Sequence, residues 1–223
     1  RLNSLSTAMT SNVPRYAVFV SPHGYGHAAR ASGVMEALNR HNGARFELFT
    51  TAPRWFFEES LKGLFEYHEV ECDVGFRQAS ALKADLGATA VALDRLLPFP
   101  DDEIDRLAQL VRASGCQALL ADIAPLGIAV AERAGIPSVL VENFTWSWLY
   151  EPFFGEHPEL EGFSDELAKW RSQATVLIQT EPLCSRDDGA RLVNPISRTA
   201  RMSRSDQLAA LGVGEGEQLI VVT

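Results

Sequence analysis

The sequence predicts an α/β domain with a mostly parallel sheet. Short apolar runs alternate with longer amphipathic runs from about residue 16 to residue 180. Strands that are apolar throughout are typical of a sheet covered on both faces, and alternation with helices requires right-handed crossovers. The pattern therefore indicates a doubly wound, Rossmann-like architecture. With 223 residues, 46% of them hydrophobic, the chain can build one such core and part of a second.

The predicted strands are short runs that are either apolar throughout or alternate with polar residues. "YAVFV" at 16–20 is continuously apolar, as expected for a strand buried on both faces, whereas "FEYHEVE" at 65–71 alternates. In chain order, the predicted strands cover 16–20, 45–51, 65–71, 117–122, 137–143 and 174–180.

Helix signals fill the intervals between these strands. The stretch 27–41 repeats apolar residues at helical spacing. The stretch 53–63 has proline near its start and glycine at its end, and 101–115 opens with acids and closes on glycine. In chain order, the predicted helices cover 27–41, 53–63, 83–97, 101–115, 125–135 and 164–173.

The two ends of the chain lie outside this alternation. Residues 1–14 are polar and lack the apolar core of a signal peptide, so we expect a flexible tail. The α/β domain is expected to cover 15–194. Residues 195–218 are expected to be an interdomain linker with a short helix. The apolar run "LIVVT" at 219–223 is expected to be the first strand of a second domain that this chain lacks, because a lone terminal strand completes no sheet of its own.

Composition excludes several classes of function. The formal net charge of −9 argues against binding to nucleic acid or to an anionic membrane. No apolar run is long enough to span a bilayer. Cys72, Cys116 and Cys184 lie far apart and form no C-x-x-C pair, as expected for free thiols in a reducing compartment. We therefore expect a cytoplasmic protein without nucleic-acid partners or a membrane span.

The stretch "SPHGYGHAARASGVMEAL" at 21–38 follows the first predicted strand and allows three interpretations. A metal site is disfavoured because two glycines separate His23 from His27 and no third ligand is evident, so no metal is expected. A dinucleotide-binding turn is suggested by G-x-G-x-x-A from Gly24 through Gly26. That fingerprint also requires an acid at the end of the second strand, where this chain has threonines.

The third interpretation is acid–base chemistry by His27. In a doubly wound sheet, the first and fourth strands lie side by side where the strand order reverses, and ligands bind at their carboxyl ends. His27 follows the first strand and Asp122 ends the fourth. The topology thus brings an imidazole and a carboxylate to one crevice, where they can form a general-base dyad. A capping or core histidine beside an unrelated aspartate is the alternative.

Other side chains are expected near the same crevice. Asn143 ends the fifth strand, and the aromatic segment that follows it includes Trp146, a candidate stacking platform for a sugar or else a core residue. Arg30 is either a surface residue or a ligand for phosphate or carboxylate. Arg77 and Gln78 follow the third strand, in a loop near this crevice. Together with Gly24 and Gly26, these residues form the predicted ligand site.

Four segments carry a resemblance to a known family. They are "HGYGHAARASGVMEAL", "CDVGFRQASAL", "LLADIAPLGIAVAERAGIPSVLVENFTWSWLY" and the late "SRSDQLAALGV" with "LIVVT". They resemble the N-terminal domain of GT-B glycosyltransferases, the two-domain fold of the UDP-glycosyltransferases and of the bacterial transferase that adds N-acetylglucosamine to the peptidoglycan lipid precursor. The resemblance is greatest to the glycosyltransferase-like region fused to plant arabinokinases and to its bacterial stand-alone relatives.

This resemblance implies that His27 matches the family's catalytic histidine and that Asp122 matches its partner aspartate. It implies that the predicted ligand site is an acceptor site, with acceptor pockets in the loop that holds Arg77 and Gln78. It implies that a second domain binds a nucleotide-sugar donor, a co-substrate rather than a cofactor. The expected activity is inverting, metal-independent transfer of a sugar to a hydroxyl of a small molecule or glycan, and we expect this chain to be inactive alone. The alternative is a module that binds a sugar or nucleotide sugar without chemistry.

Overall fold

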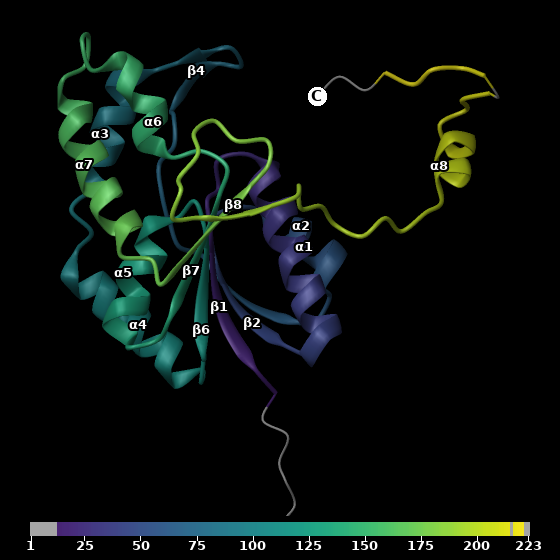
Figure 1. The fold of residues 1–223 in the computed structure, drawn as a ribbon, viewed down its shortest axis with the longest axis horizontal. Helices are drawn as coiled ribbons and strands as arrows, with labels where there is room; N and C mark the ends of the chain where they lie inside the picture. The colour runs from purple at the N-terminus through teal and green to yellow at the C-terminus, as the bar shows by residue number, and fades with distance from the viewer. Residues whose placement is uncertain (1–12, 215, 221–223) are drawn as a thin grey trace, which may run out of the picture.

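A computed structural model of the chain describes residues 13–214 and 216–220. It contains a seven-stranded sheet in which every strand pairs in parallel with its neighbours, and helices lie on both sides of this sheet (Figure 1). The predicted doubly wound α/β architecture is therefore confirmed. Across the sheet, the strands are β3 (Phe65–His68), β2 (Arg45–Phe49), β1 (Arg15–Val20), β6 (Ala118–Asp122), β7 (Ser138–Glu142), β8 (Val176–Thr180) and β9 (Arg191–Val193).

The strand order reverses between β1 and β6. From β1 the chain builds outward to β2 and β3, then crosses back and builds from β6 to β9 on the other side. Val20 is in register with Asp122, so the last residues of the two strands lie next to each other. In this architecture ligands bind in the crevice above the carboxyl ends of the two strands where the order reverses, which here are β1 and β6.

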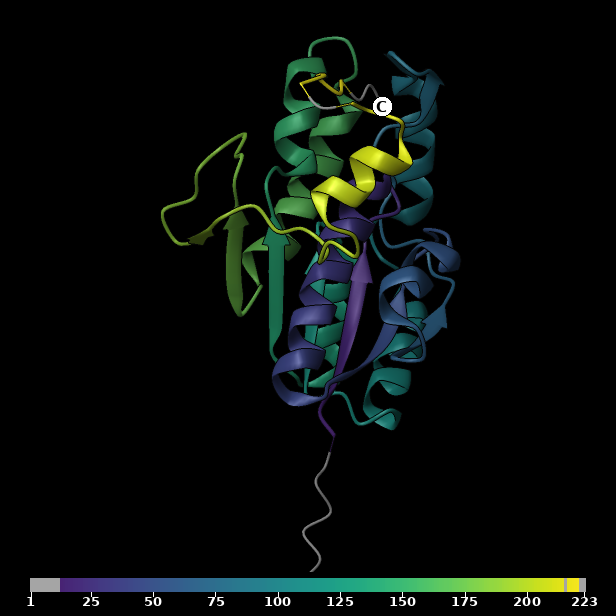
Figure 2. The same ribbon diagram turned by 90° about the vertical axis from the view of Figure 1, so that its right-hand side faces the viewer.

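The helices form two layers, one on each face of the sheet (Figures 1 and 2). Two helices, α1 and α2, cover one face, and α3, α4, α5 and α7 cover the other. In chain order the helices are α1 (Tyr25–Asn42), α2 (Arg54–Leu61), α3 (Leu86–Leu96), α4 (Asp101–Ala113), α5 (Pro125–Ala134), α6 (Trp146–Tyr150), the 3₁₀ helix η1 (Glu151–Phe153), α7 (Glu159–Ser172) and α8 (Arg204–Ala210).

Each face of the sheet has its own apolar core, and β1 contributes to both. Phe19 points into the core beneath α4, α5 and α7, whereas Val18 and Val20 point into the core beneath α1 and α2. Burying a side chain of this size contributes roughly 1.5–3 kcal/mol. A strand placed between two cores has no exposed face, which explains why "YAVFV" is apolar at every position.

Several elements differ from the sequence prediction. The strand β3 ends at His68 rather than at residue 71, α1 begins two residues early at Tyr25, and α7 begins at Glu159 rather than at residue 164. A hairpin of β4 (Gln78–Ser80) and β5 (Lys83–Ala84), helix α6 and strand β9 were not predicted at all. These elements have two to five residues, which is too few for a periodic pattern to show.

After the sheet, the chain runs beside α1 and α2 and reaches α8, which stands away from the sheet (Figure 1). The helix predicted between 195 and 218 is therefore present. Leu219 and Ile220 are in no strand, and residues 221–223 and 1–12 lie outside the described residues. The N-terminal tail, the domain boundaries and the terminal strand stay predictions. Within the described residues, no helix is long and apolar enough to cross a membrane.

Candidate active site

A glycine turn joins β1 to α1 and positions the first site residue. Gly24 has a φ of +88°, a conformation that favours glycine, and α1 begins at the next residue. His27 lies in the first turn of α1 and is 8% exposed. A Cβ atom at Gly24 or Gly26 would meet nothing within 4 Å, so the turn leaves open space above the start of the helix.

The structure brings together the two residues predicted to form a dyad. Nδ1 of His27 lies 2.9 Å from Oδ1 of Asp122, and the Asp122 residue is 4% exposed. When Nδ1 carries the proton and donates a hydrogen bond to the carboxylate, Nε2 is the nitrogen with a free lone pair. Ile123 follows directly with a φ of +48°, a strained conformation for a β-branched residue. Strain of this kind is concentrated at functional sites.

Arg30 completes a three-residue cluster with His27 and Asp122. It lies one turn further along α1, and its Nε and Nη2 donate to the two oxygens of Asp122 at 2.7 and 2.6 Å. Its Nη1 donates to Oδ1 of Asn143 at 2.7 Å. The sequence prediction placed Arg30 on the surface or in contact with a ligand. The structure corrects the first alternative, because Arg30 is 9% exposed and its three nitrogens have protein partners. Contact with a ligand stays a prediction.

A cavity of about 360 Å³ lies beside this cluster, above the carboxyl ends of the central strands. His27, Arg30 and Asn143 line it, as does Gly26 from the turn. The remaining lining residues are His23, Phe144, Thr180, Glu181, Pro182, Pro195 and Ile196. The segment after β9 thus closes one side of the cavity, which no sequence motif indicated.

Three predicted acceptor residues lie elsewhere. Trp146 is 3% exposed, and its indole Nε1 donates to Oδ2 of Asp73 at 2.8 Å, so it forms the wall behind the cavity rather than a free stacking face. Arg77 is exposed and pairs with Glu71 at 2.7 Å, and Gln78 begins the exposed β4 strand. The chain turns away from the crevice there because it forms the β4–β5 hairpin, so neither side chain lines the cavity.

Sequence reasoning missed Asp73, a second carboxylate near the dyad. Burial raises its pKa to about 6, and hydrogen bonds from Ser21 and Trp146 limit that rise. Its Oδ1 is buried and has no partner in hydrogen-bond geometry among the described residues. The available signal was an acid inside the otherwise apolar run "CDVGF", where only a paired or functional carboxylate is expected.

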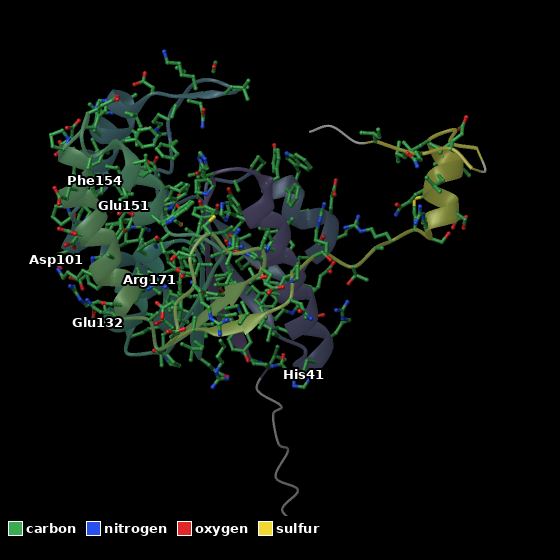
Figure 3. All side chains as sticks on the ribbon, turned by 45° about the horizontal axis from the view of Figure 1, so that its top comes forward. His41, Asp101, Glu132, Glu151, Phe154 and Arg171 are labelled. Atoms are coloured by element: carbon green, nitrogen blue, oxygen red, sulfur yellow. The ribbon has the colours of Figure 1, made fainter. Side chains whose placement is uncertain are left out.

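A second pocket, of about 460 Å³, is lined in part by Gln179 of β8 and shares Phe144 with the first. Arg171 and Asp187, which also line it, belong to an ion-pair network in which Arg171, at the end of α7, donates to both oxygens of Glu142 and to Asp187. Figure 3 shows Arg171 on the side of the sheet that α4, α5 and α7 cover, with Asp101 and Glu132 projecting from the outer helices. No cluster of three metal-ligating side chains occurs among the described residues.

The fold is that of the N-terminal domain of GT-B glycosyltransferases. Three solved structures show this, each at a TM-score of 0.53. The chain is 16% identical to UGT2 of Phytolacca americana, solved with UDP-2fluoro-glucose and pterostilbene, and covers 57% of it. It is 16% identical to the calicheamicin glycosyltransferase CalG4 and covers 53% of it. It is 17% identical to a UDP-glucosyltransferase of Polygonum tinctorium and covers 56% of it. These matches span 90%, 82% and 91% of this chain, respectively.

A similarity in sequence extends over nearly the whole chain. It is 24% identical to L-arabinokinase of Arabidopsis thaliana over 216 residues, which make up 93% of this chain and 20% of the plant protein. No family model matches. The chain therefore spans a fifth of this relative and little more than half of each solved glycosyltransferase.

Proposed function

We propose that this chain is the acceptor-binding half of an inverting, metal-independent glycosyltransferase. The observation that carries the proposal is the buried His27–Asp122 contact beside a cavity at the carboxyl ends of β1 and β6. A histidine held by a carboxylate beside an open cavity is the arrangement expected for a general base that acts on a hydroxyl.

In this mechanism, Nε2 of His27 removes the proton from an acceptor hydroxyl as its oxygen attacks the anomeric carbon of the donor sugar. The new C–O bond forms as the bond from that carbon to the nucleoside diphosphate oxygen breaks. Attack opposite the leaving group inverts the configuration. Asp122 fixes the ring orientation and compensates the positive charge that develops on the imidazole.

Arg30 and Asn143 are positioning residues in this proposal. The guanidinium binds both oxygens of Asp122, and such bidentate pairs fix geometry as well as supplying energy. Asn143, which directly follows strand β7, orients the guanidinium. The carboxylate is therefore held in one position while His27 takes up and releases its proton.

The donor is expected to bind outside this chain. The chain covers little more than half of each structure with the same fold, and one of them is complexed with UDP-2fluoro-glucose and pterostilbene. In the proposed enzyme, a second domain holds a nucleotide sugar above the cavity. The proposed chemistry relies on His27 as the base, held by Asp122, and uses no metal ion.

The test is an assay of the natural full-length protein with a panel of nucleotide sugars and hydroxyl acceptors. Release of nucleoside diphosphate that depends on the acceptor, with an inverted anomeric centre in the product by NMR, is the expected result. Binding of sugars without any turnover would support a non-catalytic binding module instead. A product with retained configuration would contradict the proposed mechanism.

A further inference from the structure

A second histidine, His23, faces the same cavity as His27 and has no role in the mechanism above. It is half-buried, and its side chain forms no hydrogen bond with any described residue. The other polar groups of the wall differ in this respect, since Arg30 and Asn143 are bonded to each other and Thr180 bonds to backbone oxygens. Glu181 is exposed at the rim.

The surrounding structure holds the His23 ring in one place. The edge of the ring packs against Trp146, with ring centroids 5.1 Å apart and an interplanar angle of 86°. Gly75 lies against both rings, because an added Cβ there would come within 2.6 Å of Nδ1 of His23 and 2.9 Å of Trp146. Only glycine fits there, both for space and for its φ of +61°.

The residues that enclose His23 are themselves anchored in the core. The hydroxyl of Tyr150 donates to the carbonyl of Gly75 at 2.9 Å, and Trp146 donates to Asp73 at 2.8 Å. The loop after β3 and helix α6 are thereby fixed to each other around the imidazole. The His23 imidazole is held rigidly and has no hydrogen-bond partner among the described residues. It can therefore bind a ligand with little loss of conformational freedom.

The charge state of the ring suits a neutral, hydroxylated ligand. Burial lowers the pKa of His23, and electrostatic interaction with His27 and Arg77 lowers it further. At neutral pH the ring therefore has one N–H donor and one acceptor nitrogen. A hydroxyl group also donates and accepts, so it matches either nitrogen.

We infer that His23 is a specificity-determining residue that hydrogen-bonds a second hydroxyl of the acceptor, adjacent to the one that His27 deprotonates. This inference rests on the proposed function and names its substrate class. The acceptor is a sugar or another polyol with neighbouring hydroxyls rather than a flat molecule with a single hydroxyl. Two histidines four positions apart, on either side of a glycine turn, thus divide recognition and proton transfer between them.

The test measures binding of methyl glycosides and their monodeoxy analogues to the chain, without donor, by NMR of the imidazole nitrogens. The wild type is expected to bind at least one glycoside, with shifts at His23, and to lose about tenfold in affinity when one particular hydroxyl is removed. In His23→Phe, which keeps an aromatic ring against Trp146, that hydroxyl should no longer matter. His23→Gln should restore part of the discrimination.

Gly75→Ala is the matched control, because it displaces the ring without removing its nitrogens and should mimic His23→Phe. Circular dichroism and thermal unfolding establish that each variant is folded.

Equal discrimination in wild type and His23→Phe would overturn the inference, and so would a failure of all glycosides to bind. An unchanged KM for the donor in the full-length His23→Phe protein distinguishes an acceptor hydroxyl from one on the donor sugar, whereas a raised donor KM would overturn the assignment. Discrimination by His23 in a protein that shows no transfer would refute the proposed function alone.

Discussion

Asp122 has two partners at once, and this is the main feature of the site at the level of single residues. Its Oδ1 lies 2.9 Å from Nδ1 of His27, and its two oxygens accept hydrogen bonds from Arg30 at 2.7 and 2.6 Å. All of these groups are buried. A buried carboxylate is stable only when it is paired and hydrogen-bonded. The guanidinium of Arg30 thus stabilises the buried Asp122 carboxylate next to His27, the proposed base.

Replacing Arg30 should therefore destabilise the fold. In Arg30→Met, Asp122 loses two charge-assisted bonds while it stays buried, and we expect the free energy of unfolding to fall by about 3 kcal/mol. Urea denaturation measures this loss. Arg106→Met, which removes an exposed pair with Glu103, is the control and should change stability by less than about 0.5 kcal/mol. An unchanged urea midpoint for Arg30→Met would show that Asp122 does not need the guanidinium.

Asp73 should make stability depend on pH in the direction opposite to that of a paired carboxylate. Its pKa rises from 3.8 to about 6 on folding, so the folded state binds the proton more tightly than the unfolded state. The stabilisation is complete below pH 3.8 and is lost as the pH rises through 6. Asp73→Asn cannot ionise, so its stability relative to wild type should increase by up to about 3 kcal/mol between pH 4 and pH 8.

Urea unfolding of wild type and Asp73→Asn at both pH values measures that difference, with the exposed Asp188→Asn as the control. A constant difference between wild type and Asp73→Asn across this range would mean that folding does not shift the pKa of Asp73.

At the level of elements, helix α1 carries three functions at intervals of one turn. His27 and Arg30 face the cavity, and Gly33 lies beneath the segment that leaves the sheet. Residues spaced by three or four positions share one face of a helix. A Cβ at Gly33 would lie 2.7 Å from the carbonyl oxygen of Ser197, so this glycine lets the segment pack directly on α1.

Gly33→Ala should displace that segment and leave the sheet intact. Nearby contacts include Arg40 to Thr199 and Arg198 over the ring of Phe56, and these should weaken together. We expect faster cleavage by trypsin at Arg198 and Arg201, followed by mass spectrometry. Gly162→Ala in α7, where an added Cβ meets nothing within 4 Å, is the control and should leave the cleavage rate unchanged. Equal rates for Gly33→Ala and wild type would refute the packing role.

The sequence predicted the elements that position the dyad because their signals are strong. The strands β1 and β6 are continuous apolar runs, and a parallel sheet then leaves few possible orders. The contact between His27 and Asp122 followed from this topology. Strand β9 could not be predicted, because its three residues are two exposed and one half-buried.

The side-chain partners were harder to predict than the backbone. An arginine on a helix is usually exposed, and nothing local shows that Arg30 binds Asp122 across 92 positions. Trp146 was predicted to be either a stacking platform or a core residue, and the sequence could not decide between them. In the structure Asp73 binds its indole and holds it in the wall. Both outcomes depend on contacts between distant segments that a single sequence does not contain.

At the level of the whole molecule, the chain is one GT-B-like domain whose proposed site lies along one edge of the sheet. The acidic side chains Asp101, Glu132 and Glu151 are exposed on α4, α5 and η1 (Figure 3). The cluster of His27, Arg30 and Asp122 lies instead where the strand order reverses. A second domain that holds a nucleotide sugar above this edge would complete the proposed enzyme.

The most direct test of the central claim is kcat of His27→Ala in the full-length protein. A positioned general base contributes on the order of 10²–10⁴-fold, so we expect kcat to fall by that factor and KM for the donor to change little. His41→Ala is the matched control, since His41 is exposed at the opposite end of the same helix (Figure 3) and should keep wild-type turnover. Near wild-type kcat in His27→Ala would contradict the account, because the imidazole would then be structural.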